Sequence, residues 1–268
     1  MSSTDLLLFE KRGHIGYLTL NRPEKRNPLG LTGDGEAFAA AARMINADPD
    51  LRCVIMTGAG SAFSAGGDLK AMRDRTGEFG GNNLQLRDHY RESIHMIIKS
   101  MWNIEVPMIA AINGPAIGLG GDVATTCDIR LSAASAKFGA TFLKIGLIPG
   151  DGGAWLLPRA IGWSRAAQLY FTGDVVDAQT ARDWGLVSEV YPDDQLMAEA
   201  EKLAGRIVQQ PPQALRMTKR LMREGQTATF DAIMEMSAAM QVLVQRTDDH
   251  MEAVNAFFEK RQPEFKGQ

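Results

Sequence analysis

AFSAGGDL, residues 62–69, and GPAIGLGGD, residues 114–122, are the two stretches that decide the fold of this chain. In each, an apolar strand-like segment runs into glycines and then into a helical sequence. Glycine permits a turn with positive φ and lets a ligand reach the main chain. The first N–H groups of the following helix have no partner within that helix, and they carry the positive end of its dipole. Both stretches therefore predict oxyanion sites, and the alternative is a pair of ordinary tight turns.

Short strands and amphipathic helices alternate on both sides of these glycine turns. The strand signals Leu6–Glu10 and His14–Leu20, with a charged turn between them, predict a hairpin. Parallel strands need long crossover connections, so the alternation predicts an α/β fold. The other predicted strands are Cys53–Thr57, Met108–Ile112, Cys127–Ser132 and one near Leu186–Val190, and the predicted helices among them cover Thr32–Asn46 and the apolar stripe from Leu86 to Met101.

Strands end at Pro192, and the remaining residues have helical patterns. These predicted helices are Asp193–Gln209, Pro212–Glu224, Thr229–Gln245 and one that Thr247 caps. We therefore divide the chain into a core over residues 1–192 and a helical C-terminal region over residues 193–268. The charged, glycine-rich segment Arg73–Asn83 has no periodicity and predicts a surface loop, which is either a lid or a plain connector.

Composition limits the classes of function. The 268 residues are 45% hydrophobic and 23% charged, with a formal net charge of −3, so no nucleic-acid partner or anionic membrane is expected from the overall charge. No apolar stretch approaches the roughly 20 residues of a membrane helix. The first residues do not show a positively charged segment followed by a long apolar one, which is the pattern of a secretory leader. Cys53 and Cys127 each lie in an apolar run. We therefore expect a cytoplasmic protein with two core cysteines, although counting leaves a disulfide open.

Familiar cofactor motifs fail on spacing. A dinucleotide fingerprint would need glycine where Phe63 or Val123 stands. The chain also has no phosphate-binding loop of the Gly-x-x-x-x-Gly-Lys type and no Gly-x-Ser-x-Gly elbow. His89 and His95 are six residues apart, which is not the spacing of a metal pair on a helix, so we expect no metal site.

Six ordered segments of the sequence resemble one family. These segments are the opening strands, Asn21-Arg22-Pro23 with Asn27, the turn Ala65–Leu69, the stretch from Asn113 through Asp122, Gly146–Pro149, and the ending Phe258–Phe265. Together they resemble the crotonase, or enoyl-CoA hydratase/isomerase, superfamily over essentially the whole chain. The resemblance implies a crotonase-like spiral of ββα units with a helical C-terminal trimerisation region, and assembly as a homotrimer or a dimer of trimers.

The resemblance also implies a ligand and the residues that hold it. The substrate would be an acyl-CoA thioester, and no separate cofactor is needed because CoA is part of that substrate. The main-chain N–H groups of Gly67 and Leu119 would form the oxyanion hole for a thioester enolate, where such donors are worth roughly 3–4 kcal/mol each. The residues implied for CoA are Lys25, Arg26, Asn27, Ala65, Gly67, Asp68, Leu69 and Lys70, with Lys260 reaching the CoA of a neighbouring subunit. The alternative for Lys25 and Arg26 is a pair of solvated loop cations.

The acidic residues depart from the hydratase pattern. Hydratases of this family use two glutamates, which fall at Asp122 and Phe142 in this sequence. Phenylalanine cannot transfer a proton, so the paired-glutamate mechanism cannot be copied onto this chain. Asp151 lies nearby in the family frame and can complete an acid–base pair with Asp122. The alternatives are a helix-start acid for Asp122 and a helix N-cap for Asp151.

Three hypotheses follow. The leading one is a hydratase or isomerase of an unsaturated acyl-CoA, with hydratase-like lyase activity first and isomerase activity a close second. The second keeps the acyl-CoA pocket but changes the reaction to thioester hydrolysis, decarboxylation or carbon–carbon cleavage. The third is a catalytically silent protein that binds CoA esters, which Phe142 suggests. The sequence does not specify the acyl chain.

Overall fold

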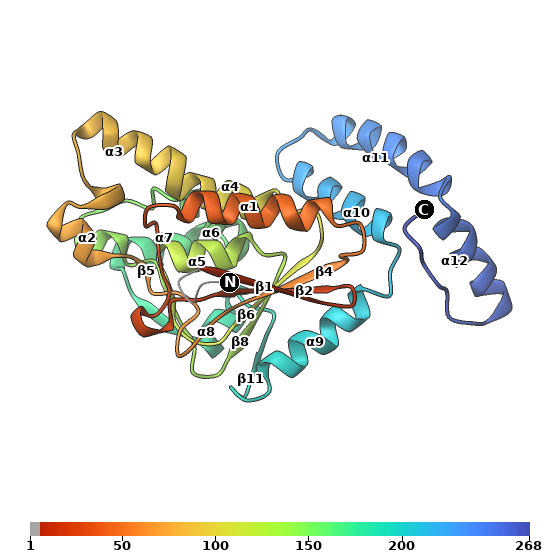
Figure 1. Ribbon diagram of the computed structural model, residues 1–268, viewed down its shortest axis with the longest axis horizontal. Helices are drawn as coiled ribbons and strands as arrows, with labels where there is room; N and C mark the ends of the chain where they lie inside the picture. Colours follow the sequence, from red (N-terminus) through yellow and green to blue (C-terminus); the bar gives the residue numbers. More distant parts are fainter. Residues whose placement is uncertain (1–5) are drawn as a thin grey trace.

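A six-stranded sheet forms the centre of the computed structural model, which describes residues 6–268 (Figure 1). Its strand order is β1 (Leu7–Arg12), β2 (Ile15–Leu20), β4 (Cys53–Gly58), β6 (Met108–Ile112), β8 (Ile129–Ala133) and β11 (Glu189–Tyr191). The first two strands form the predicted antiparallel hairpin, and every later neighbour is parallel. The α/β prediction is therefore confirmed.

Two short sheets lie at the ends of the main strands and contain the glycine turns. One pairs β3 (Pro28–Leu29) with β5 (Gly66–Gly67) in parallel. The other has the order β10 (Val175–Asp177), β9 (Lys137–Gly139), β7 (Ala116–Ile117). Each glycine turn thus becomes a short strand that leads directly into a helix.

Helices connect the strands and continue beyond them. In chain order they are α1 (Asp34–Ala47), α2 (Leu69–Asp74), α3 (Asn83–His89), α4 (His95–Trp102), α5 (Leu119–Thr126), α6 (Gly153–Ile161), α7 (Trp163–Thr172), α8 (Ala178–Asp183), α9 (Leu196–Ile207), α10 (Pro212–Glu224), α11 (Phe230–Gln245) and α12 (Asp248–Glu259). Single 3-10 turns occupy η1 (Pro23–Lys25), η2 (Gly77–Phe79) and η4 (Thr141–Ile145). None of the helices within residues 6–268 combines the length and apolar character needed to cross a bilayer.

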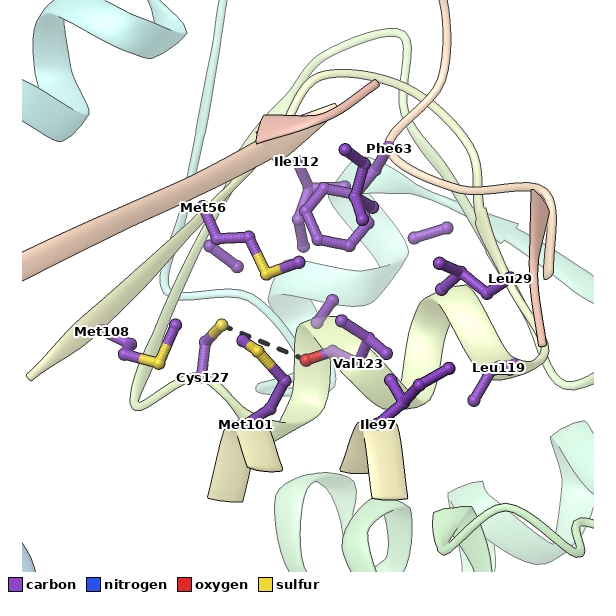
Figure 2. Close-up of a cluster of buried hydrophobic side chains, with 14 of the residues drawn as sticks. Leu29, Met56, Phe63, Ile97, Met101, Met108, Ile112, Leu119, Val123 and Cys127 are labelled. Atoms are coloured by element: carbon purple, nitrogen blue, oxygen red, sulfur yellow. Dashed lines mark hydrogen bonds between the residues drawn. The ribbon is translucent and has the colours of Figure 1, made fainter. Parts of the chain in front are cut away.

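The main sheet is buried on both faces because successive side chains of a strand point to opposite sides. Val54 and Met56 of β4 face the larger core, together with α1, α4 and α5. Cys53 and Ile55 of the same strand face a smaller core that α9 covers. Figure 2 shows part of the larger core, where the Cys127 thiol lies 4.0 Å from the carbonyl oxygen of Val123. Both cysteines are buried and free, which confirms the prediction of two core cysteines without a disulfide between them.

The C-terminal helices separate from the sheet in stages. Helix α9 packs on the sheet through Leu196, Ala200 and Ala204. In contrast, α11 has no buried residue, and α11 and α12 extend away from the sheet beyond α10 (Figure 1). The Thr247 side chain accepts a hydrogen bond from the N–H of His250, which confirms the predicted cap. The division at residue 193 stays a prediction, and the packing shows that α9 shares the core of the sheet.

Two sequence predictions around the second crossover need correction. The predicted surface loop Arg73–Asn83 begins inside α2 and contains the turn η2, whose Phe79 is buried. The predicted continuous helix from Leu86 to Met101 is interrupted by the π-helical segment η3 (Tyr90–Ile94). Apolar periodicity locates such a helix but does not reveal one extra residue in a single turn, and such π-segments occur often at functional sites.

Candidate active site

The two glycine turns lie side by side, joined through their main chains. The Ser64 N–H donates to the Pro115 carbonyl oxygen at 3.0 Å, and the Ile117 N–H donates to the Ser64 carbonyl oxygen at 3.0 Å. Gly66 has a φ of +89°, and a Cβ there would lie 2.6 Å from the Ile117 carbonyl oxygen. Only glycine permits so close an approach at that backbone conformation. The approach brings Gly67 and Leu119 into the wall of one cavity.

This cavity, which we call the glycine-turn cavity, has a volume of about 170 Å³. Leu119 is the first residue of α5. The N–H of Asp122 donates to the Gly118 carbonyl oxygen at 3.0 Å and so closes the first turn of this helix. The preceding N–H groups carry the positive end of the helix dipole. Apart from the turns, the wall is mostly apolar, and it includes Met72, Phe79, Ile94, Phe142 and Leu147, with the carboxyl residue Asp151 among them.

Asp122 and Asp151 form a buried carboxyl pair, with each residue only 5% exposed. Asp122 projects from α5, and Asp151 precedes α6. Gly153 makes the contact possible, because a Cβ at that position would overlap the Asp122 carboxyl group. Oδ2 of Asp122 and Oδ1 of Asp151 have no hydrogen-bond partner within residues 6–268. Each is a buried polar atom whose hydrogen-bonding capacity the described residues leave unused.

The surroundings of the pair favour one shared proton. Burial raises the pKa of Asp122 well above its usual range, and the charge of Asp151 and the hydrogen bond to Asp151 raise it further, while the backbone N–H of Gly153 opposes the change. Burial also raises the pKa of Asp151, although the hydrogen bond from Asp122 and the proximity of His95 oppose that change. Two like charges in contact disfavour double ionisation. We infer that Asp122 holds the proton and Asp151 carries the charge.

The two acids differ in their position relative to the glycine-turn cavity. Asp151 lines the glycine-turn cavity, whereas Asp122 lines a separate cavity of only about 30 Å³ behind it. Asp151 is also not the N-cap of α6, because Gly152 holds that position without a side-chain cap. The helix-cap alternative for Asp151 is therefore wrong.

Aromatic side chains and a histidine surround the pair, and sequence reasoning did not assign them to the site. Tyr170 has a buried hydroxyl without a partner in residues 6–268, and burial, with the charges of the two acids, raises the pKa of that hydroxyl. Its ring lies 6.4 Å from that of Phe142. His95 Nε2 lies 2.8 Å from the Gly150 carbonyl oxygen, next to Asp151. In the sequence, Phe142 stood out only as the position of the family's second glutamate, and the spacing of His95 from His89 pointed away from a metal site.

Asn27 is hydrogen-bonded to the main chain at and just before the first glycine turn. Its side chain is fully buried, and Nδ2 donates to the carbonyl oxygens of Ala59 at 2.9 Å and Ala62 at 2.8 Å. Its Oδ1 accepts from the N–H of Arg22 at 2.8 Å, and the Ser64 hydroxyl donates to the Asn27 carbonyl oxygen at 2.7 Å. These protein contacts occupy the side-chain amide, and a contact of Asn27 with CoA stays a prediction.

The other residues implied for CoA come from two segments, and only the segment from Ala65 to Lys70 contributes to the cavity wall. Lys25 and Arg26 are exposed, and the Arg26 carbonyl oxygen accepts from the N–H of Ala65 at 2.9 Å. Ala65, Gly67 and Leu69 line the cavity, and Leu69 and Lys70 are exposed. The Asp68 side chain caps α2 by accepting from the N–H groups of Lys70 at 2.9 Å and Ala71 at 3.0 Å.

Lys260 is remote from this cavity within one chain. It follows α12, and Figure 1 places α12 at the end of the molecule opposite β5 and α2. A contact with the CoA of a neighbouring subunit stays a prediction. Within residues 6–268, no group of three or more histidine, cysteine, aspartate or glutamate residues is arranged to hold a metal ion.

The carboxyl pair predicts an unusual dependence of stability on pH. A carboxyl whose pKa rises on folding binds more protons in the folded chain, so folding stability falls as pH rises from the unfolded value of about 3.9 toward the folded one. Asp122→Asn removes this cost, and its amide can donate to Asp151. We expect the variant to melt above the parent at pH 8, by about 2–4 °C for each kcal/mol gained.

Thermal melts between pH 4 and pH 8 measure this difference, which should disappear toward the acid end of the range. The exposed Asp88 provides the control, and Asp88→Asn should follow the parent at every pH. A melting difference for Asp122→Asn that stays constant with pH would contradict the titration argument.

Comparison with known proteins places this geometry in a family. Residues 10–268 match the family model described as enoyl-CoA hydratase/isomerase. The chain is 36% identical to 1,2-epoxyphenylacetyl-CoA isomerase of Escherichia coli (strain K12), over 93% of this chain and 94% of that protein. It is 35% identical to crotonyl-CoA hydratase of Syntrophomonas wolfei, over 97% of each. The solved enoyl-CoA hydratase from Bacillus anthracis superposes with a TM-score of 0.91 at 34% identity, covering 98% of this chain and 100% of that one. These matches confirm the predicted crotonase-like fold.

Proposed function

This chain belongs to the enoyl-CoA hydratase/isomerase family, and from that premise we propose that it moves a double bond along an unsaturated acyl-CoA through a thioester enolate. The observation that carries the proposal is the buried Asp122–Asp151 pair beside the two glycine turns. CoA is part of the substrate, so the proposal includes no separate cofactor.

Each part of the site has one task in this reaction. The N–H groups of Gly67 and Leu119 hold the thioester oxygen, which becomes negative as the enolate forms. The Asp151 carboxylate removes a proton from the carbon next to the carbonyl and returns it two carbons further along, so the 3-enoyl-CoA becomes the conjugated 2-enoyl-CoA. Asp122 holds its proton and keeps Asp151 in place. The apolar wall that includes Phe142 excludes water from the enolate.

Hydration is the second candidate. The unpartnered oxygens of Asp122 and Asp151 are acceptors that a water molecule can use, and one relative is a crotonyl-CoA hydratase. Against it, only Asp151 of the two acids lines the glycine-turn cavity. Phe142 occupies the position where the resemblance implies the second glutamate, so a water has no second carboxylate opposite the pair.

An absorbance assay separates the two reactions. Isomerisation of a 3-enoyl-CoA increases the conjugated-enoyl absorbance, whereas hydration of crotonyl-CoA decreases it. We expect the increase with 3-hexenoyl-CoA and little change with crotonyl-CoA. A rapid decrease with crotonyl-CoA would favour hydration instead. No change with either class, across several chain lengths, would contradict both candidates.

We also propose that the chain assembles as a homotrimer or a dimer of trimers through its C-terminal region. Support comes from the large apolar side chains that α11 and α12 expose: Phe230, Met234, Val242, Leu243, Met251, Phe257 and Phe258. Large apolar side chains that are exposed in such number on two helices favour an interface there.

Replacing Phe257 and Phe258 with aspartate is expected to shift the native mass from the assembly toward single chains. These side chains are 79% and 77% exposed, so the single chain loses little packing while an apolar interface would have to bury two charges. Native mass spectrometry measures the shift. Leu84→Asp, on α3 at the other end of the molecule, is the control with an equally apolar exposed side chain. An unchanged mass for the double variant would place the interface elsewhere.

A further inference from the structure

A second cavity of about 490 Å³ adjoins the glycine-turn cavity, and we call it the arginine cavity. The two share four wall residues, which are Tyr90, Leu147, Ile148 and Gly150. The thioester end of a substrate would lie at the glycine turns, on the other side of this shared wall. An acyl chain that extends past Tyr90 therefore enters the arginine cavity.

The remaining walls of the arginine cavity are basic. They are Arg87 on α3, Arg91 in the π-helical segment η3, and His95 at the start of α4. Arg87 and Arg91 are exposed, and neither guanidinium forms an ion pair or hydrogen bond with any residue in the described range 6–268. By contrast, two arginines that line other cavities are ion-paired, Arg216 with Glu105 at 2.9 Å and Arg223 with Asp128 at 3.2 Å.

No acidic side chain balances this charge within the cavity. Asp88 and Glu92 lie on the same helical stretch but are not among the residues that line it. Leu147 and Ile148 provide an apolar floor, and Ile148 is 75% exposed. The cavity thus combines a floor for methylene groups with two free guanidinium groups one turn apart. Guanidinium groups bind carboxylates with paired hydrogen bonds, which gives both charge and geometry to the recognition.

We propose that the substrate is an acyl-CoA whose acyl chain ends in a carboxylate, and that Arg87 and Arg91 bind this distal carboxylate. The inference rests on the proposed function, because it assumes that the thioester lies at Gly67 and Leu119. It specifies the chemistry at the far end of the acyl chain, which the proposed function does not specify. His95 contributes to the basic wall, although its Nε2 also contacts the Gly150 carbonyl oxygen at 2.8 Å.

Binding of two matched probes tests the proposal without requiring turnover. Adipyl-CoA and hexanoyl-CoA have chains of equal length, and only the first ends in a carboxylate. Calorimetry with the full chain should give a dissociation constant about tenfold lower for adipyl-CoA. In the double variant Arg87→Gln, Arg91→Gln the ratio should fall close to one. Lys99→Gln is the control, because Lys99 is an exposed cation of α4 that lines neither cavity, and it should keep the parent ratio.

The other outcomes separate this inference from the proposed function. Equal affinity of the parent for both probes, together with turnover of 3-hexenoyl-CoA, overturns only the inference. If the double variant weakens adipyl-CoA, hexanoyl-CoA and free CoA by the same factor, the arginines bind CoA phosphates, and the inference is likewise overturned. If neither probe binds and no acyl-CoA reacts, both proposals fail.

Discussion

Replacing Asp151 with asparagine is expected to lower kcat for isomerisation by about 10²–10⁴-fold while leaving the affinity for a saturated acyl-CoA nearly unchanged. Asp151 is the member of the carboxyl pair that lines the glycine-turn cavity. Asparagine has almost the same shape but cannot remove a proton. Asp122 cannot take over, because it does not line the glycine-turn cavity and its burial still raises the pKa of its carboxyl when Asp151 is neutral. The oxyanion hole and the acyl pocket remain intact, so binding should survive.

Three measurements check this result. The rise in conjugated-enoyl absorbance gives kcat, and deuterium uptake from heavy water at the carbon next to the carbonyl reports the first proton transfer alone. Calorimetry with hexanoyl-CoA gives the affinity. Asp122→Asn is the matched comparison and should lose less activity, because the base remains. If Asp122→Asn were the more damaging change, then Asp122 and not Asp151 would be the base.

The sequence predicts much of the scaffold because the relevant signals are local. The predicted strand Met108–Ile112 and the predicted helix Pro212–Glu224 have the observed bounds of β6 and α10. An apolar run after Pro107 and a proline at a helix start are signals contained in a few residues. The parallel direction of neighbouring strands also follows, because a helix that connects two strands returns the chain to the same end of the sheet. The bend at η3 could not be predicted, because a π-turn arises from packing and not from periodicity.

The candidate site is less predictable because its residues meet only in space. The meeting of Asp122 and Asp151 came from the family resemblance, and no spacing in the chain indicates it. Which of the two acids lines the glycine-turn cavity depends on how α5 and α6 pack, and no local pattern shows it. His95 and Gly150 are 55 positions apart in the sequence. Such a contact depends on tertiary packing, and neither composition nor local pattern encodes it.

Gly66→Ala is expected to cost about 2–5 kcal/mol of folding stability and to lower kcat by about 10²–10³-fold. Part of the stability cost is the φ of +89°, which disfavours any residue with a Cβ. The rest comes from the new methyl group, which would lie 2.6 Å from the Ile117 carbonyl oxygen. Main chain on both sides cannot move out of the way as a side-chain tip can. The two glycine turns must therefore separate.

Separation of the turns should affect catalysis more than binding. The same Cβ would lie 3.7 Å from the N atom of Leu119, so the strain acts directly on one proposed donor and on its distance from Gly67. Gly13→Ala isolates the strain of the backbone conformation, because Gly13 has a φ of +58° in the β1–β2 turn and no atom within 4 Å of its Cβ position. We expect this control to lose about 1–2 kcal/mol and to keep its kcat. Urea unfolding and kcat, measured where both variants are folded, compare the two. Loss of stability in Gly66→Ala without loss of kcat would show that the turns do not hold the reacting oxygen, because the mutation displaces main chain and leaves both acids in place.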